Sequence, residues 1–309
     1  MALTRISRTV TRLISMAKWL RPPVALLAAL AVVATIAPQA EAARVPRLKH
    51  VWVFVLENHS YNEIIGNPDV PYLNHLARRH GVATRYYAVA HPSLPNYLAM
   101  ISGSTHRCTS NGCAGNYPGR TLPGQFATHG LRWRAFIEAL PRAGYIGRDS
   151  GNYTRHHNPF VYFRSIVRKP RQRARITPFR GFGRSLRRPP ALSYIVPTDA
   201  HNMHSGSEGV ADAWLHTWIP RVMHSRGFRH HGAIFITWDE ASKGDKSGCC
   251  IEGVHGGHQP LIAIVHNGPR HARLRKLRSA YSLLRTIEAG FRFGHLGHAA
   301  RAHPLAKFF

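Results

Sequence analysis

The sequence predicts an α/β fold with a mainly parallel sheet and helices on both of its faces, and two observations support this. Short runs such as HVWVFVL at 50–56 are apolar almost throughout, as expected of strands that are covered on both sides. These runs alternate along the chain with segments that have the composition and the end signals of helices. Alternation of this kind is typical of a parallel sheet layered between helices.

The expected elements follow one another in a regular order. Strands are predicted at 50–56, 83–90, 192–198, 232–238 and 260–266, where apolar and β-branched residues cluster. Helices are predicted at 71–81, 93–103, within 125–144, at 211–225 and at 279–291. Gly81 is expected to end the first helix, and Pro141 and Gly144 the helix within 125–144.

The chain is strongly basic, with 42 Lys and Arg against 14 Asp and Glu and a formal net charge of +28. Such a charge attracts anionic partners but does not choose among phospholipid surfaces, nucleic acids and phosphorylated metabolites. The segment 168–190 is rich in arginine, has no acid and no periodicity, and is predicted to be a long surface loop. It is interpreted either as a peripheral contact with an anionic membrane or as a solvated insertion.

The N-terminus has the pattern of a secretory signal. Five cations precede an uncharged run rich in Ala, Val and Leu, and small residues follow at PQAEAAR. We therefore expect a signal peptide at 1–43, a single catalytic domain at 44–309, and secretion to the extracellular space or the cell envelope. An uncleaved N-terminal anchor is the alternative.

Export makes disulfides permissible, and the chain has four cysteines. Cys108 and Cys113 enclose a short polar loop and are expected to pair. Adjacent Cys249 and Cys250 are expected to stay reduced, or one of them to pair elsewhere. A zinc site is the competing interpretation, but the paired CxxC spacing typical of one is missing from the sequence.

Acidic residues are scarce, yet three groups of them follow predicted strands directly. Glu57 and Asn58 end the first strand, Asp199 follows the strand at 192–198, and Asp239 and Glu240 end the strand at 232–238. Because ligands bind beyond the carboxyl ends of parallel strands, we expect these side chains to share one site. One such acid alone would more often be a helix cap. Their oxygens suit a divalent cation of unknown identity, and nearby histidines keep zinc open.

A serine and several histidines complete the candidate site. Ser93 lies between a predicted strand and a predicted helix, where it is either an ordinary helix cap or a nucleophile close to bound phosphate. Among 22 histidines most must be ordinary surface residues. The better candidates are His157 in HHNPF and His201 and His204 in HNMH; the weaker ones are His91, His255 and His258.

Ordered motifs from about residue 50 to about residue 296 resemble the bacterial phosphoesterase family of secreted acid phosphatases and phospholipases C. These motifs are LENHSYNEIIG, PYLNHLA, YYAVAHPSLPNYLAMISG, HNPFVYF, HNMHSG, ITWDE and YSLLRTIE. The resemblance implies the three-layer α/β/α sandwich of the alkaline-phosphatase-like superfamily. It also implies that Glu57 with Asn58 and Asp239 with Glu240 bind metal, and that Ser93 is the nucleophile.

The same resemblance implies that His157, His201 and His204 contact phosphate or protonate the leaving group. The chain departs from the family at Asn202, where His-Asp-Met-His is expected and His-Asn-Met-His is found. This departure puts the role of that strand end in doubt.

The resemblance leads us to expect a secreted, metal-dependent acid phosphatase that hydrolyses phosphate monoesters, with phosphoinositides among the candidate substrates. Its partner would be a phosphorylated small molecule or a phospholipid headgroup, and nucleic acid is not expected. A phosphodiesterase of the phospholipase C type on the same site is the first alternative. A non-catalytic basic binding protein is the second.

Overall fold

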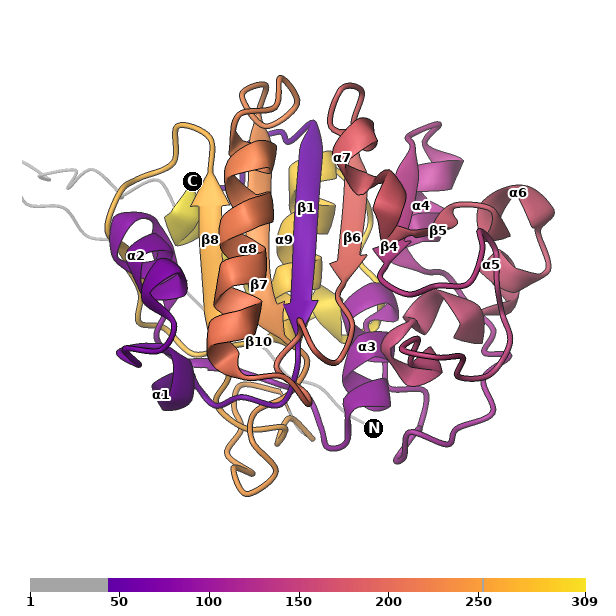
Figure 1. Cartoon of the computed structure of the whole chain (residues 1–309), viewed down its shortest axis with the longest axis horizontal. Coiled ribbons are helices and arrows are strands. Elements are labelled where there is room, and N and C mark those ends of the chain that lie inside the picture. Colours follow the sequence, from indigo (N-terminus) through magenta and orange to yellow (C-terminus); the bar gives the residue numbers. More distant parts are fainter. Residues whose placement is uncertain (1–43, 252) are drawn as a thin grey trace, which may run out of the picture. The chain divides into compact units, whose positions relative to one another are not determined.

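The computed structural model describes residues 44–251 and 253–309, so the predicted signal peptide at 1–43 lies outside the described residues. The strands of the main sheet are β1 (His50–Leu56), β2 (Gly81–Ala83), β4 (Trp133–Ile137), β5 (Ile176–Pro178), β6 (Leu192–Val196), β7 (Gly232–Trp238), β8 (Leu261–Val265) and β9 (Ala272–Leu274). They form one eight-stranded sheet in the order β5-β4-β6-β1-β7-β8-β2-β9 (Figure 1). Strands β3 (Tyr86–Tyr87) and β10 (Arg278–Ser279) form a separate pair.

The prediction of a mainly parallel sheet is confirmed. Strand β1 runs parallel to both of its neighbours, β6 and β7, and β6 runs parallel to β4. The exception is β8, which is antiparallel to β7 and to β2. The carboxyl ends of β1, β6 and β7 therefore meet at one edge of the sheet, the lower edge in Figure 1.

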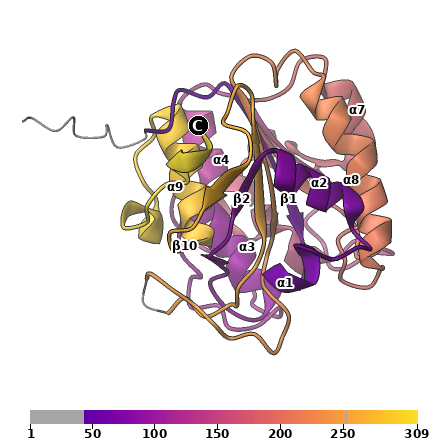
Figure 2. The same ribbon diagram turned by 90° about the vertical axis from the view of Figure 1, so that its left-hand side faces the viewer.

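Helices cover both faces of the sheet, which gives the predicted three-layer α/β/α sandwich (Figure 2). The described α-helices are α1 (Tyr61–Ile64), α2 (Pro71–Arg79), α3 (Ser93–Ser102), α4 (Leu122–Thr128), α5 (Arg164–Val167), α6 (Pro170–Arg173), α7 (Phe182–Ser185), α8 (Glu208–Met223) and α9 (Ala280–Phe291). Helices α3, α4 and α9 pack on one face, and α2, α7 and α8 pack on the other.

Strand β1 shows why the two layers are needed. Val53 and Val55 belong to the core under α3 and α9, whereas Phe54 and Leu56 belong to the core under α2 and α8. All four side chains are buried because neighbouring residues of a strand point to opposite faces. Burial of each contributes roughly 1.5–3 kcal/mol relative to exposure, so both helical layers are required for stability.

Some sequence-based expectations of secondary structure were wrong. In the segment 125–144 the helix ends at Thr128, and Trp133–Ile137 is strand β4, which pairs with β5 and β6. The segment 83–90 contains only the last residue of β2 and the short β3. The basic segment 168–190 is not a loop, because it contains α6, the edge strand β5 and α7. At Trp133–Ile137, pairing with β5 and β6 outweighed the local helix signals.

Both cysteine pairs are bonded. Cys108 and Cys113 form the expected disulfide. Adjacent Cys249 and Cys250 form a second one, so the expectation that they stay reduced or pair elsewhere was wrong. The two cysteines are consecutive in the chain, with Cα atoms 3.7 Å apart. Among the described helices, none has the length and apolar content to cross a membrane.

Candidate active site

The site begins with the register between β1 and β7. Leu56 pairs with Trp238, so the next residues of the two strands, Glu57 and Asp239, lie side by side at the carboxyl edge. Asp239 Oδ1 accepts a hydrogen bond of 3.1 Å from the backbone N–H of Asn58. Glu57 and Asp239 are fully buried, and Glu240 nearly so. The parallel register therefore brings together the acids that the sequence placed at two strand ends.

Ser93 is the first residue of helix α3, and its hydroxyl contacts two of the carboxylates. Its hydroxyl lies 3.2 Å from Glu57 Oε2 and 3.3 Å from Glu240 Oε1, as hydrogen-bond donor to either oxygen. The turn before the helix is held by Asn96, whose Oδ1 accepts the backbone N–H groups of Val89 and Ala90 at 2.9 Å. The serine is thus buried and held in position by its own helix and by two strands.

Tyr97 is a member of the site that the sequence analysis missed. Its phenol donates a hydrogen bond to Glu57 Oε1, so the two oxygens of Glu57 face Ser93 and Tyr97 respectively. The signal was available, because residues four apart on a helix lie on the same face and Tyr97 follows Ser93 by four. Burial, followed by the charge of Glu57, raises the pKa of this phenol, which therefore stays protonated.

His157 connects the cluster to the end of β6. Its Nε2 lies 3.3 Å from Glu57 Oε2, and its Nδ1 lies 3.2 Å from Asp199 Oδ1. Burial lowers the pKa of His157, with a partial opposing effect of Asp199. Burial raises the pKa of Asp199 in turn, but His157 and Thr154 outweigh it and leave that pKa well below its usual range. Asp199 is therefore an anion beside the imidazole, and among the described residues neither ring nitrogen of His157 has a partner in hydrogen-bond geometry.

His91 contacts the opposite side of the cluster. Its Nδ1 lies 2.6 Å from Glu240 Oε2, and its Nε2 lies 2.8 Å from the backbone carbonyl of Asp245. The hydrogen bond with Glu240 raises the pKa of His91 above its ordinary value, against the effect of burial. The weak candidate His91 thus lies closer to the carboxylates than two of the stronger ones.

The carboxylates form an environment that a cation would stabilise. Burial, followed by the charge of Asp239, raises the pKa of Glu57. Burial, followed by the charge of Glu240, raises the pKa of Asp239 to about 8. Oδ2 of Asp239 is buried without a hydrogen-bond partner. Unsatisfied hard oxygen atoms of like charge are the donors that divalent cations take.

The side chains of the site match a divalent cation in their chemistry, although they are not arranged around a common point. Within residues 44–251 and 253–309, no three His, Cys, Asp or Glu side chains already surround one point as metal ligands. Glu57, Asp239 and Glu240 nevertheless all contact or adjoin Ser93, with no lysine or arginine among their recorded ion-pair partners in the described chain. The residues present thus fit a divalent cation by their charge, burial and oxygen atoms.

The structure does not bring all the predicted residues together. Asn58 contributes its backbone N–H to Asp239. His201 pairs with Glu138 Oε2 at 2.9 Å and stacks on Trp214, so its contacts lie outside the Ser93 cluster. His204 is exposed, with its ring 5.7 Å from that of His157.

The two remaining histidine candidates have contacts of other kinds. His258 contacts the backbone carbonyl of Thr84 at 3.0 Å and stacks between Tyr61 and Tyr87. For His255, the recorded contact is its backbone N–H on the carbonyl of Val89. Neither ring has a recorded contact with the carboxylates in the part of the chain that the structure describes.

Asn202, the departure from the expected family pattern, has a structural function. It is buried; its backbone carbonyl accepts the N–H of Glu57 at 2.8 Å, and its Oδ1 accepts the N–H of His204 at 2.8 Å. Its Nδ2 lies 3.4 Å from Asp199 Oδ1. The backbone carbonyl of Asn202 therefore joins the ends of β1 and β6, whereas its side-chain amide adds a donor toward Asp199 that a carboxylate would lack.

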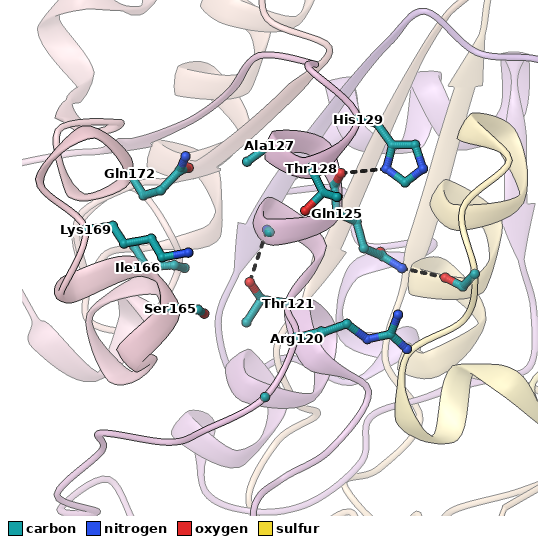
Figure 3. A pocket seen from close by; sticks show the side chains of 13 residues that line it. Arg120, Thr121, Gln125, Ala127, Thr128, His129, Ser165, Ile166, Lys169 and Gln172 are labelled. Atoms are coloured by element: carbon teal, nitrogen blue, oxygen red, sulfur yellow. Dashed lines mark hydrogen bonds between the residues drawn. The ribbon is translucent and has the colours of Figure 1, made fainter.

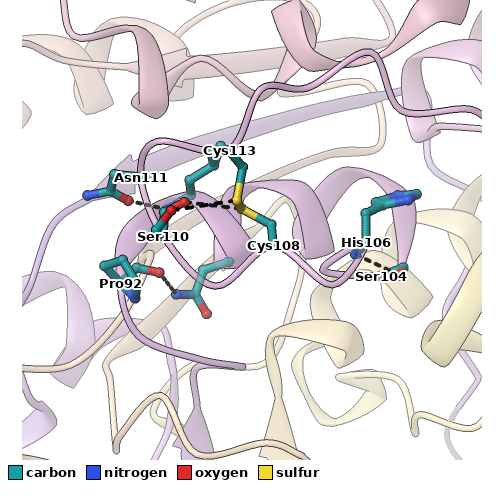
Figure 4. The surroundings of a disulfide bond; sticks show 9 residues. Pro92, Ser104, His106, Cys108, Ser110, Asn111 and Cys113 are labelled. Atoms are coloured by element: carbon teal, nitrogen blue, oxygen red, sulfur yellow. Dashed lines mark hydrogen bonds between the residues drawn. A yellow bond between two sulfur atoms is a disulfide. The ribbon is translucent and has the colours of Figure 1, made fainter.

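The Cys108–Cys113 disulfide supports the start of α3. Within the loop that it closes, Asn111 Oδ1 accepts the backbone N–H of Leu94 at 3.0 Å. Figure 4 shows Asn111 and the disulfide beside Pro92, the residue before Ser93. Leu94 is in the first turn of the helix, whose N–H groups have no partner within the helix. The loop thereby fixes the backbone next to the serine.

Two hollows differ in their relation to this site. A cavity of about 330 Å³ lies beside Asp199 and is also lined by Thr154, Thr198 and Ser205, which places it next to the His157 pair. A cavity of about 450 Å³ lies between α4 and the α5–α6 segment and contains none of the predicted site residues (Figure 3). Of the two, the first adjoins the site, through Asp199.

Comparison with protein families gives an independent result. Residues 67–245 match the model of the Phosphoesterase family. The chain is 30% identical over 271 residues to phosphatidylinositol-3-phosphatase of Mycobacterium tuberculosis, which covers 85% of this chain and 84% of that protein. It is 27% identical over 225 residues to an acid phosphatase of Aspergillus fumigatus, covering 69% of this chain and 49% of that protein. The chain thus spans about half the length of this fungal relative.

Solved structures support the fold. A protein in the alkaline phosphatase superfamily from Vibrio parahaemolyticus aligns with a TM-score of 0.57 at 12% identity, over 81% of this chain and 68% of that one. The phosphonate monoester hydrolase of Agrobacterium radiobacter aligns with a TM-score of 0.56 at 14% identity, over 84% of this chain and 77% of that one. At these identities the likeness shows the shared α/β/α architecture and no more.

Proposed function

This chain belongs to the Phosphoesterase family, and on that basis we propose that it is a metal-dependent acid phosphatase that hydrolyses phosphate monoesters through Ser93. The relatives named phosphatidylinositol-3-phosphatase and acid phosphatase support a phosphoric monoester hydrolase. Phosphoinositides are the substrate class that we propose, because the mycobacterial relative named phosphatidylinositol-3-phosphatase matches most of both chains.

One observation carries the mechanistic part of the proposal. The hydroxyl of Ser93 is buried at the start of α3 and lies within hydrogen-bond distance of Glu57 and Glu240, and His157 lies 3.3 Å from the same Glu57 oxygen that Ser93 contacts. A serine that only capped the helix would bond the backbone of its own first turn, and Ser93 bonds two carboxylates instead. Carboxylates in that position can accept the hydroxyl proton as the oxygen attacks.

The proposed reaction has two displacements at phosphorus. In the first, Ser93 Oγ forms a bond to phosphorus, the bond to the ester oxygen breaks, and the alcohol leaves with a proton. In the second, water attacks the phosphoserine and releases inorganic phosphate, and the proton returns to Ser93. At the start of α3 the N–H of Leu94 already donates to Asn111 and Pro95 has no N–H, so the helix would favour the phosphoryl oxygens mainly through its dipole.

A divalent cation held by Glu57, Asp239 and Glu240 would supply the positive charge that offsets the phosphate oxygens and lowers the pKa of a bound hydroxyl. The side chains of the protein have roles of their own in the proposal. Tyr97 fixes Glu57, His91 fixes Glu240, and Asp199 is an anion beside His157. His157 is the histidine that we assign to the phosphate or to the leaving group, since it alone of the three stronger candidates contacts the cluster.

Secretion is part of the proposal and rests on the N-terminal sequence pattern. Two disulfides within the described residues support it, because disulfides persist mainly in oxidising compartments. A fractionation experiment on cells that produce the full chain should place the activity outside the cytoplasm. Activity that remains with the cytoplasmic fraction would contradict secretion and would leave the catalytic proposal intact.

A substrate panel tests the catalytic proposal directly. The purified protein should release phosphate from p-nitrophenyl phosphate and from a short-chain phosphatidylinositol 3-phosphate, and a chelator should stop both reactions. Bis(p-nitrophenyl) phosphate and a phosphocholine diester should react far more slowly. The opposite preference would favour a phospholipase C type of diesterase, and no turnover of any ester would favour a non-catalytic binding protein.

A further inference from the structure

A hollow of about 690 Å³ opens at the edge of the sheet away from Ser93. It is formed where β4, β5 and β6 begin, together with α6 and α7. Seven arginines line it and no acid does: Arg132, Arg134, Arg171, Arg175, Arg184, Arg187 and Arg188. We call this set the arginine hollow. Most of the arginines of the segment 168–190, which was predicted to be a loop, line this hollow.

The arginines of this hollow are largely free of protein partners. All recorded ion pairs in the described part of the chain involve histidine, so none joins one of these guanidinium groups to a carboxylate. Arg132 is the exception in hydrogen bonding, because its Nη2 donates to the carbonyls of Arg188 and Pro189. Burial, followed by the neighbouring Arg132 and Arg175, lowers the pKa of Arg134. The cations repel one another and lack a counter-charge within the described chain.

A second cationic hollow provides a comparison, because some of its arginines have hydrogen-bond partners within the protein. It measures about 770 Å³ and lies along α9 and β9. Three of its arginines already donate to backbone carbonyls: Arg273 to Ala77, Arg278 to Pro304, and Arg292 to Val45. The other three arginines of this second hollow, Arg44, Arg275 and Arg285, have no side-chain hydrogen bond within the described residues. In the arginine hollow this is true of six of the seven arginines. The arginine hollow is therefore the better candidate for an external anion.

We propose that the arginine hollow is a second binding site, separate from the catalytic one, for a molecule that carries several phosphate groups close together. Guanidinium groups bind phosphate through paired hydrogen bonds, and seven of them around one concave space match a compact ligand with several phosphates. A volume of this size is in the range of sites for small ligands.

The shape and place of the hollow disfavour a flat membrane as the ligand. The site is concave, and it lies at the amino ends of strands whose carboxyl ends face the catalytic edge. A strand of five residues such as β6 spans roughly 16 Å, so one flat surface cannot touch both sites. Occupation of the hollow therefore leaves the Ser93 cluster open to substrate.

Isothermal titration with sodium tripolyphosphate tests the proposal in a Ser93→Ala background, which removes turnover of the probe. The test variant is Arg171→Gln with Arg184→Gln and Arg187→Gln, three exposed residues whose side chains form no hydrogen bond with any of the described residues. The matched control is Arg78→Gln with Arg79→Gln and Arg270→Gln, three exposed arginines on the far side of the sheet next to β9. Both variants lose the same charge.

The two variants should behave differently. The test variant should bind tripolyphosphate at least about tenfold more weakly than the Ser93→Ala parent, and the control should stay within about twofold. The affinity of the parent should fall steeply as salt is added. Equal weakening in both variants would show diffuse charge attraction and overturn the proposal.

Two further probes exclude other classes of ligand. Vesicles of phosphatidylcholine with phosphatidylserine, and a single-stranded oligonucleotide, are titrated against the same three proteins. If either probe depends on the three arginines while tripolyphosphate does not, the hollow is a membrane or nucleic-acid surface and the proposal is wrong. Neither result changes the catalytic proposal, because the substituted arginines lie outside the Ser93 cluster.

Discussion

The two edges of the sheet hold charge in opposite ways. At the carboxyl edge, Glu57, Asp239 and Glu240 are buried and in contact with polar side chains that fix their positions. At the other edge, arginines such as Arg184 and Arg187 are exposed and free of recorded carboxylate partners. At these two edges, the acids lie where solvent is excluded and the arginines lie where solvent is present.

This difference predicts how the two edges respond to substitution. Burial of a charge costs desolvation free energy and couples the charge strongly to its neighbours, so the loss of one group should disturb the whole cluster. An exposed charge is screened by water and salt, so each one should contribute little by itself. Four experiments test this difference between the two edges, and they follow in order of decreasing expected effect on turnover.

Ser93→Ala should have the largest effect. Turnover of p-nitrophenyl phosphate should fall at least about a thousandfold, because the substitution removes the attacking oxygen itself. Ser102→Ala is the matched control, since Ser102 ends the same helix and bonds the carbonyl of Leu98. It should keep most of the activity. Similar activity in both variants would remove Ser93 from the role of nucleophile.

Asp239→Asn should lower turnover about a hundredfold and weaken the binding of a divalent cation in isothermal titration. It should also change the response of the metal-free protein to pH. Because the folded protein raises the pKa of Asp239 to about 8, it holds the proton more tightly than the unfolded chain does.

The metal-free wild type should therefore lose stability as pH rises from about 5 to about 8, since the unfolded chain releases this proton first. The variant should lose less over the same range, measured as melting temperature. An identical decline in both proteins would show that the buried acids do not repel one another as described. Unchanged cation binding would remove Asp239 from the metal site.

Tyr97→Phe should lower kcat about tenfold and leave KM nearly unchanged. The phenol donates to Glu57, and a hydrogen bond to a charged group contributes about 1.5 kcal/mol or more, but Tyr97 does not meet the substrate in our proposal. Tyr194→Phe is a suitable control, because that buried phenol bonds Met100 Sδ instead of a carboxylate. Equal losses in the two variants would indicate a general effect of buried phenols.

The combined substitution Arg171→Gln, Arg184→Gln and Arg187→Gln should have the smallest effect. In the protein with Ser93 intact, turnover of p-nitrophenyl phosphate should stay within about twofold, because uniform attraction does not stabilise the transition state. A loss of more than about tenfold would mean that the arginine hollow communicates with the catalytic edge. It would also break the contrast between the two edges on which these experiments rest.

The sequence was most informative where the position of a side chain follows directly from the end of a strand or the start of a helix. Glu57 and Asp239 could be predicted as neighbours because a parallel sheet aligns its carboxyl ends, and the register of β1 with β7 confirms their proximity. Ser93 could be placed at a helix start from the proline that follows it by two. The metal-binding and catalytic functions of these residues stay predictions.

The sequence was least informative where pairing partners lie far apart in the chain. Trp133–Ile137 has a local composition that also fits a helix, and only its position between β5 and β6 makes it a strand. His201 could not be separated from His157 by pattern, because Glu138, which contacts His201, lies 63 residues away. Tyr97 was missed although helical spacing pointed to it. The arginine hollow could not be predicted, because it forms where β4, β5 and β6 begin and these positions are separated in the sequence.

The closed loop from Cys108 to Cys113 has a practical consequence for anyone producing this protein. Asn111 bonds Leu94 from a ring that a reducing agent can open, and no strand or helix lies within that ring. Material made in a reducing cytosol, or purified with a thiol reductant, should therefore look well folded by circular dichroism and still be a poor catalyst. Assays should begin with oxidised protein.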